Sequence, residues 1–324
     1  NLSGGNLTVS EGKTFTWTGA ASVWSGGQIS GAGTVRNTGS VTMNATTTLA
    51  GSFANASSFT QTAGQMNLSG VFTNEGTGTF TEQSTTSPQI TGSGTFSNAG
   101  AFSRPNSGAV SLLAGFTNAT GGSVQVASGA AVTMTGLAAP GTTHNGSFSI
   151  ASSASITWSN GTTNFGSGAS ITGAGTAQFN AGTYNVNANL GSTSVNISGG
   201  TMNIASGAVW SWSGANSAFS SGTINGPGTV TNTGTIALTG GTLATTLLNQ
   251  GTVKWTGGAT IGNSSGSLVN QATFDDQTTG GAIFQANFTN QSGATYTHSN
   301  ANTVIFGSAF VNDGTVTING GTLT

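Results

Sequence analysis

The sequence predicts an all-β fold, a right-handed parallel β-helix (β-solenoid) of roughly 16 coils of about 20 residues each. Three observations lead to this fold class. Apolar residues alternate with polar ones from end to end, residues typical of amphipathic helices are scarce, and the chain repeats itself at a fixed spacing. The right-handed sense follows from the general preference of parallel crossovers.

Short strings in which every second residue is apolar recur along the chain, for example Val41-Thr-Met43, Met66-Asn-Leu68 and Val316-Thr-Ile318. Period two is the pattern of a strand with one buried face, and β-branched residues fit a pleated surface. No stretch has apolar residues at the i, i+3, i+4 and i+7 positions of an amphipathic helix. We therefore expect strands throughout.

The segment Ser3–Met43 recurs at Ser198–Leu238, where an ungapped alignment at an offset of 195 matches 18 of 41 positions. Such self-similarity indicates repeated units that bury their apolar faces against one another. Residues 1–324 are predicted to be a single continuous β-solenoid, a segment of a longer repeat protein. Related modules are expected at about 3–43, 147–186, 198–238 and 239–274.

Composition excludes several classes of partner. Only 3% of the residues are charged, against about 25% in an ordinary soluble domain, and the net charge is −2. Four scattered Lys and Arg residues build no basic patch for nucleic acid or an anionic membrane. The absence of Cys rules out disulfides and thiolate metal sites, and no apolar run is long enough for a transmembrane helix. We expect no cofactor.

The turns carry a second periodic signal: an apolar residue shortly before an Asn, then one residue, then Gly or Ala, then a strand residue. Successive sites lie near multiples of about 20 residues apart. Asn tolerates a left-handed backbone, and its amide can bond to the Asn of the next coil, so the pattern predicts a structural turn ladder. Its predicted members are Asn37, Asn74, Asn98, Asn118, Asn180, Asn232, Asn249, Asn270, Asn290 and Asn312.

A second corner type is Gly-x-Gly-Thr, found at Gly31–Thr34, Gly92–Thr95, Gly173–Thr176 and Gly226–Thr229. An Ile stands two residues before each corner and is expected to point inward and stack. These residues are Ile29, Ile90, Ile171 and Ile224. Four tryptophans that each begin a Trp-Ser/Thr pair are expected to stack or cap in the same way: Trp17, Trp158, Trp212 and Trp255.

The apolar-x-Asn-x-Gly-Thr-apolar turns and the Gly-Gly-Thr-Leu/Met starts, such as Gly240–Leu243, resemble the β-solenoid stalks of large bacterial exported proteins. These are the filamentous-haemagglutinin-like adhesins and the autotransporter passenger domains. The resemblance implies a secreted parallel β-helix displayed at the cell surface. Coil lengths are uneven and no recognisable secretion or cell-binding segment stands out, so the resemblance leaves the export route open.

Parallel β-helices also include polysaccharide lyases and hydrolases, whose chemistry needs paired carboxylates or carboxylate-bound Ca²⁺. Here Asp275-Asp276 is the one adjacent pair of acids, and we interpret it as a solvated turn. His144 and His298 are interpreted as inert surface residues, and Arg104-Pro105 as a loop corner. No enzymatic activity is expected. Ice binding needs a fixed Thr-x-Thr at one place in each coil, which the sequence lacks.

The expected function is that of a non-enzymatic extracellular structural protein at the cell surface. It would be a rigid fibre, filament or surface-layer component that self-associates end to end or side by side. The alternative is an adhesin stalk with a surface glycan or matrix ligand. For the adhesin, the irregular stretches Glu82–Gln89 and Leu137–Gly146, interrupted by Pro88 and Pro140, are candidate loops or plain corner insertions.

Overall fold

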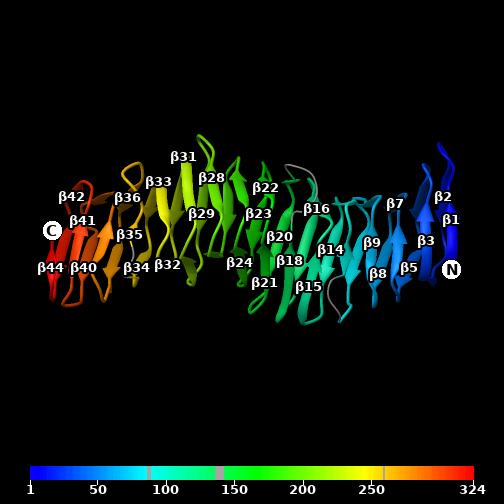
Figure 1. Ribbon diagram of the computed structural model, residues 1–324, viewed down its shortest axis with the longest axis horizontal. Coiled ribbons are helices and arrows are strands. Elements are labelled where there is room, and N and C mark those ends of the chain that lie inside the picture. Colours follow the sequence, from blue (N-terminus) through cyan, green and yellow to red (C-terminus); the bar gives the residue numbers. More distant parts are fainter. Residues whose placement is uncertain (86–88, 136–141, 258–259) are drawn as a thin grey trace. The chain divides into compact units, whose positions relative to one another are not determined.

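The computed structural model describes residues 1–85, 89–135, 142–257 and 260–324, and all regular structure in these ranges is strand (Figure 1). The chain divides into two compact units, unit 1 (Asn1–Gly175) and unit 2 (Thr176–Thr324). In each unit the strands stack parallel and in register, and the described residues form about 15 coils in all. The predicted parallel β-helix is confirmed, whereas its handedness and its continuity from residue 1 to 324 stay predictions. Pro88 and Pro140 of the two candidate loops lie outside the described residues.

Each regular coil contributes three strands, which we call the ladder, second and third faces. In unit 1, for example, strands β7, β8 and β9 of one coil pair in register with β4, β5 and β6 of the coil before. Two long strands, β31 and β33, turn the corner from the third face to the ladder face without a break. The residues that follow one another along the chain therefore lie on three different faces of the same coil.

In unit 1 the ladder face consists of β2 (Thr14–Trp17), β4 (Thr34–Asn37), β7 (Ser52–Asn55), β10 (Val71–Asn74), β13 (Thr95–Asn98), β16 (Gly115–Asn118), β19 (Thr142–His144) and β22 (Thr162–Phe165). The second face consists of β3 (Ser22–Ser30), β5 (Ser40–Met43), β8 (Ser58–Gln61), β11 (Thr79–Glu82), β14 (Ala101–Arg104), β17 (Ser123–Val126), β20 (Ser147–Ile150) and β23 (Ser170–Thr172). The third face consists of β1 (Leu2–Thr8), the end of β3, β6 (Thr47–Leu49), β9 (Met66–Leu68), β12 (Ile90–Thr91), β15 (Gly108–Leu112), β18 (Ala130–Met134) and β21 (Ser155–Trp158).

In unit 2 the ladder face consists of β26 (Leu190–Ser192), β29 (Val209–Trp212), β31 (Thr223–Asn232), β33 (Thr242–Asn249), β36 (Ser267–Asn270), β39 (Asn287–Asn290) and β42 (Phe310–Asn312). The second face consists of β24 (Thr176–Phe179), β27 (Ser194–Ile197), β30 (Ser217–Phe219), β32 (Thr235–Leu238), β34 (Thr252–Trp255), β37 (Thr273–Asp276), β40 (Thr295–His298) and β43 (Thr315–Ile318). The third face consists of β25 (Thr183–Val186), β28 (Thr201–Ile204), the beginnings of β31 and β33, β35 (Thr260–Ile261), β38 (Ala282–Phe284), β41 (Thr303–Phe306) and β44 (Thr322–Leu323).

The alternation of the sequence becomes an alternation of burial, because successive side chains of a strand point to opposite faces. In β10, for instance, Phe72 and Asn74 are buried while Val71 and Thr73 face outward. Because the strands of neighbouring coils pair in parallel register, similar side chains lie directly against one another from coil to coil. The Phe72 ring stacks on Phe53 and Phe96 of the neighbouring coils at centroid distances of 5.2 and 4.6 Å. The interior is thus an aromatic and aliphatic column.

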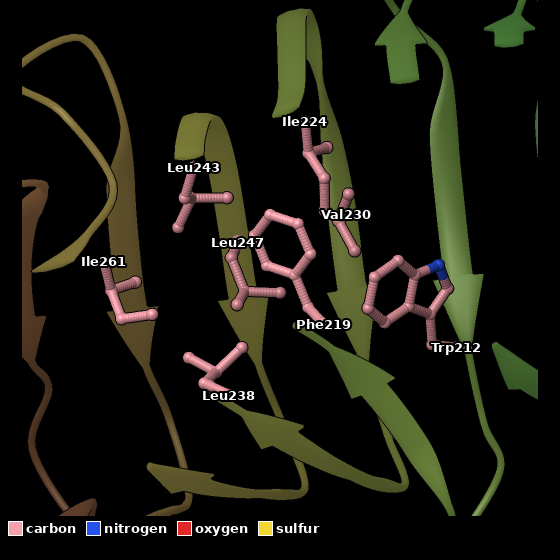
Figure 2. Close-up of a pocket in the computed structure, with 8 residues that line it drawn as sticks. All are labelled: Trp212, Phe219, Ile224, Val230, Leu238, Leu243, Leu247 and Ile261. Atoms are coloured by element: carbon pink, nitrogen blue, oxygen red, sulfur yellow. The ribbon is translucent and has the colours of Figure 1, made fainter. Parts of the chain in front are cut away.

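The interior of unit 2 is filled in the same way. Figure 2 shows eight apolar side chains from β29 to β35 directed toward one another. They enclose a void of only about 10 Å³, at the lower limit for one water molecule. These residues leave no room for a ligand, so this part of the core is packing.

Glycine is required at corners where one coil touches the next. Gly31 and Gly226, the first residues of two Gly-x-Gly-Thr corners, have φ of +95° and +102°. A Cβ on either would lie 2.2 Å from a carbonyl oxygen of the preceding coil. Both the backbone angle and the close approach exclude a side chain.

The aromatic column generates the first prediction. Phe72→Ala is expected to destabilise unit 1 by about 3–5 kcal/mol, because it removes a fully buried ring from a stack and leaves a cavity. Its outward neighbour Thr73→Ala is the matched control, with a change within about 0.5 kcal/mol. Denaturant midpoints measure both. Equal effects of the two substitutions would contradict the inward stacking of Phe72.

Candidate functional site

The most regular feature of unit 1 is a column of asparagines at the ends of the ladder-face strands. Each Asn donates from Nδ2 to Oδ1 of the Asn in the next coil, at 2.7–2.8 Å. The column consists of Asn37, Asn55, Asn74, Asn98 and Asn118, all of them buried. Its amides also donate to backbone carbonyl oxygens of the following corner, as Asn74 does to Ala101. Each rung therefore ties together two coils and a corner.

Unit 2 repeats the arrangement, again with donor–acceptor distances of 2.7–2.8 Å. Its column consists of Asn232, Asn249, Asn270, Asn290 and Asn312. An exposed second row lies beside it, in which Gln250 donates to Gln271 and Gln271 to Gln291, at 3.0 and 2.9 Å. The structure thus brings nine of the ten predicted asparagines into two separate ladders.

Asn180 is the exception, and the prediction is wrong for it. Asn180 is exposed and accepts a hydrogen bond from the Ser198 hydroxyl instead. It directly follows the inward Phe179, so the alternation turns its side chain outward. The predicted left-handed backbone is also wrong, because the only described non-glycine residue with positive φ is Ser153. The ladder depends on amide hydrogen bonds between ordinary strand residues.

The four predicted Ile residues and four predicted Trp residues are all buried. Ile29, Ile90, Ile171 and Ile224 point inward but stack on other apolar residues in register, such as Leu49 below Ile29. In each unit a tryptophan stands in register with the first asparagine of the ladder. Trp17 is in register with Asn37, and Trp212 with Asn232. Trp158 is in register with Met134, and Trp255 with Leu238 and Asp276.

His144 occupies the rung after Asn118. Asn145 donates its N–H to the Asn118 carbonyl oxygen, as Ala119 does to Asn98, which places His144 in ladder register. Its Nδ1 accepts the Asn118 backbone N–H at 3.1 Å. Burial lowers the pKa of His144 to about 4, because the site disfavours the charged ring. His144 is therefore a neutral interior residue, and the surface interpretation is wrong.

A buried ion pair lies on the second face of unit 1. Arg104 donates from Nη1 to Glu82 Oε2 at 2.6 Å and to the Ser84 carbonyl oxygen at 2.7 Å, and neither charged side chain reaches solvent. Glu82 Oε1 accepts hydrogen bonds from the Ser84 N–H, at 3.0 Å, and from the Ser84 hydroxyl. Burial raises the pKa of Glu82 to about 7, while Ser84 and Arg104 counteract the rise. The Arg104 side chain is thus a core group and not part of a loop corner.

Unit 2 has the equivalent pair in Asp276 and His298. His298 Nδ1 lies 3.0 Å from Asp276 Oδ2, and both side chains are fully buried. Thr278 donates hydrogen bonds to Asp276 Oδ1 from its N–H and its hydroxyl, at 3.0 and 2.8 Å. Asp275 points outward from the same strand. The predicted solvated Asp-Asp turn is wrong for Asp276, and the surface interpretation is wrong for His298.

The two pairs correspond to one another along the sequence. Acid, hydroxyl and base residues of unit 1 and unit 2 are each separated by 194 positions: Glu82 and Asp276, Ser84 and Thr278, Arg104 and His298. Sequence reasoning missed them because it compared the copies only over the best-matching segment. That comparison used an offset of 195, so aligning both pairs, which lie 194 residues apart, would also have required a one-residue gap.

Two outward features complete the description. Thr235, Thr252, Thr273, Thr295 and Thr315 stand in register on the second face of unit 2, a column that the sequence analysis did not anticipate. The neighbouring column contains Lys254 beside Asp275, so the surface is not uniformly threonine. In unit 1 a depression of about 270 Å³ lies over Ser103, Gln125 and Ser149, which are also in register.

Comparison with protein families, with curated proteins and with solved structures finds no match for this chain. Within the described ranges, no helical segment has the length and apolarity that a membrane crossing requires. Among the same residues, no group of three or more acidic or His side chains is arranged to hold a metal ion.

The asparagine ladder predicts that replacing one of its members destabilises the fold more than replacing an exposed asparagine outside it. Asn74→Leu is expected to destabilise unit 1 by about 2–5 kcal/mol, because it removes the donor to Asn98 Oδ1 and the acceptor of Asn55 Nδ2 in the buried column. The control Asn180→Leu removes an exposed amide, for which we expect less than about 1 kcal/mol. Thermal or denaturant unfolding of the wild type and both variants measures these losses of stability. A neutral Asn74→Leu variant would show that the ladder contributes no stability.

His144 predicts acid sensitivity of unit 1. Because the folded pKa of about 4 lies below the ordinary 6.5, the unfolded chain binds the proton first. Stability is complete above about pH 6.5 and falls as the pH drops toward about 4, by about 3 kcal/mol. His144→Asn, which places an amide in the sixth rung, removes this dependence.

The quantity to measure is the difference in unfolding free energy between wild type and His144→Asn at pH 4.5 and pH 7, since other titrating groups then cancel. The difference should shift in favour of the variant at the lower pH. A constant difference would contradict a neutral, buried His144.

Proposed function

We propose that this chain is a non-enzymatic extracellular structural protein, a rigid β-solenoid element of a fibre, filament or surface layer. The observation that carries the proposal is the continuous coil-to-coil bonding along each ladder, five asparagines in each unit. Stacked coils joined by backbone bonds, amide ladders and aromatic columns resist bending. A surface with few charges that is rich in Thr, Ser and Asn suits an exposed position outside the cell.

The buried ionisable groups support a structural role. Arg104 and Glu82 bond to each other across adjacent coils and to nearby backbone groups, and Asp276 and His298 do the same, so both pairs serve to join coils. All four side chains are at most 1% exposed. A catalytic acid or base needs access to substrate, which these groups lack.

Self-association is favoured by the exposed apolar side chains of unit 2. Ile305, Val311 and Ile318, on β41, β42 and β43, are 42–47% exposed, and a hollow of about 240 Å³ lies beside them between Phe306, Phe310 and Leu323. Exposed apolar surface of this kind marks an interaction site. Ile305 and Val311 lie in the outward phase of their strands, so packing of a second copy against β41 and β42 would bury them.

An adhesin stalk is the second candidate, and the depression over Ser103, Gln125 and Ser149 favours it. Hydroxyl and amide groups at a regular spacing suit hydrogen bonds to the hydroxyls of a glycan. The ligand would lie along the coils, on the outside of unit 1.

Electron microscopy across a dilution series tests the structural proposal. We expect filaments of uniform width that lengthen with protein concentration and show the axial strand spacing of about 4.8 Å. Val311→Lys is expected to shorten or abolish them, because it places a charge in the joint. Val71→Lys is the matched control, since Val71 is a similarly exposed Val on β10 of unit 1.

Particles that stay discrete at all concentrations would overturn filament assembly and leave the adhesin. Glycan-array binding that is lost in Gln125→Ala but kept in Val311→Lys would then support the second candidate. Filaments that form equally well with Val311→Lys would contradict the proposed joint.

A further inference from the structure

Hydrogen-bond donors converge on both carboxylate oxygens of Asp276. Oδ1 accepts the Thr278 N–H at 3.0 Å and the Thr278 hydroxyl at 2.8 Å, and Oδ2 accepts the Tyr296 hydroxyl at 2.7 Å. The Thr278 hydroxyl itself accepts from Asn302 Nδ2 at 3.0 Å, so its proton points to the carboxylate. Donors converging on both oxygens stabilise a carboxylate. The Tyr296 pKa is raised, chiefly by burial and further by Asp276, which keeps the phenol a donor.

His298 faces an acceptor on each side. Its Nδ1 lies 3.0 Å from Asp276 Oδ2, and its Nε2 lies 3.2 Å from the carbonyl oxygen of Asn302. A neutral imidazole has one donor nitrogen, so one of these contacts would set a lone pair against an acceptor. The doubly protonated ring donates to both. Gly321 packs against Nε2, where a Cβ would lie 2.9 Å away, and closes this side of the ring.

The position of His298 in the repeat also favours a doubly protonated ring. Its counterpart at an offset of 194 is Arg104, whose guanidinium is charged at every ordinary pH and bonds both to a carboxylate and to backbone carbonyl oxygens. His298 bonds to the same two kinds of acceptor. The second unit therefore keeps the paired acid and base of the first, with an imidazole in place of the guanidinium.

We propose that His298 is a buried imidazolium paired with the Asp276 carboxylate, and that its deprotonation loosens the coils of β37, β40 and β43 as the pH rises. The direction is fixed by linkage. A base that is charged in the folded state contributes stability while it holds its proton and loses that contribution when the proton leaves. The described charged or titratable groups that face the ring are Asp276 on β37 and Tyr296 on its own strand. Asp275 and Lys254 point outward.

The chain contains only two histidines, which makes a direct test possible. Nitrogen NMR of the full chain labelled with ¹⁵N-histidine distinguishes protonated from bare ring nitrogens, and His144→Asn assigns the two rings. In the pH range where the His144 ring shows one bare nitrogen, we expect both nitrogens of His298 to carry protons. A bare nitrogen on His298 within that same pH range would overturn the proposal.

Two variants separate the ion pair from general packing. Asp276→Asn is expected to give His298 a bare nitrogen at neutral pH, whereas Asp275→Asn, one residue away on the outer face, leaves both nitrogens protonated. If Asp276→Asn does not fold, the spectrum of the wild-type ring still decides.

The loosening itself is measured by amide hydrogen exchange, corrected for the intrinsic rate. Ser299, whose N–H bonds to Asp276, and Asn319, whose N–H bonds to His298, should lose about tenfold or more of their protection once the His298 ring deprotonates. Thr233, which bonds to Trp212 elsewhere in unit 2, should keep its protection. Unchanged protection at Ser299 and Asn319 after deprotonation would overturn the proposed loosening.

Discussion

In-register parallel stacking is the constraint on which the rest of the structure depends. Because each strand pairs residue for residue with the strand of the next coil, every inward side chain meets the inward side chains directly above and below it. Apolar residues satisfy this condition by packing alone, as the Phe53, Phe72 and Phe96 rings do. A polar residue at an inward position needs hydrogen-bond partners, and its neighbours along the axis are placed to supply them. The asparagines and the ion pairs therefore occur in columns.

The chain uses two kinds of polar column, which differ in their response to solvent conditions. The asparagine ladders are neutral, and each amide is both donor and acceptor, so they extend over five coils without accumulating charge. The ion pairs are limited to two adjacent coils and need additional donors to hold the carboxylate, supplied by Ser84 in unit 1 and Thr278 in unit 2. Burying charge is costly unless it is paired and fully hydrogen-bonded. This requirement explains why acid, hydroxyl and base recur together at one offset.

The sequence was sufficient for the fold class because alternation and repetition are local, countable patterns, and most ladder residues followed from their spacing. Asn55 was missed because it is followed by Ala-Ser, although Phe53 two residues earlier places it in the inward phase. Asn180 was wrongly included because its preceding Phe179 is one residue away, in the opposite phase. Phase, more than spacing, decides which Asn enters the ladder. The ion pairs could not be inferred from alternation, because Glu82, Arg104, Asp276 and His298 are polar residues at inward positions.

The two histidines show how position in a column sets protonation. His144 stands among the rings of Phe116, Phe148 and Phe165, and its Nδ1 must accept a backbone N–H, so the neutral ring fits. His298 stands between two acceptors, so the charged ring fits. Acid acts on the first residue, because protonation would place a charge on its buried ring. The same side chain thus meets one donor in the column of unit 1 and two acceptors in the column of unit 2, so its neighbours along and across the coils determine which form of the ring can be hydrogen-bonded.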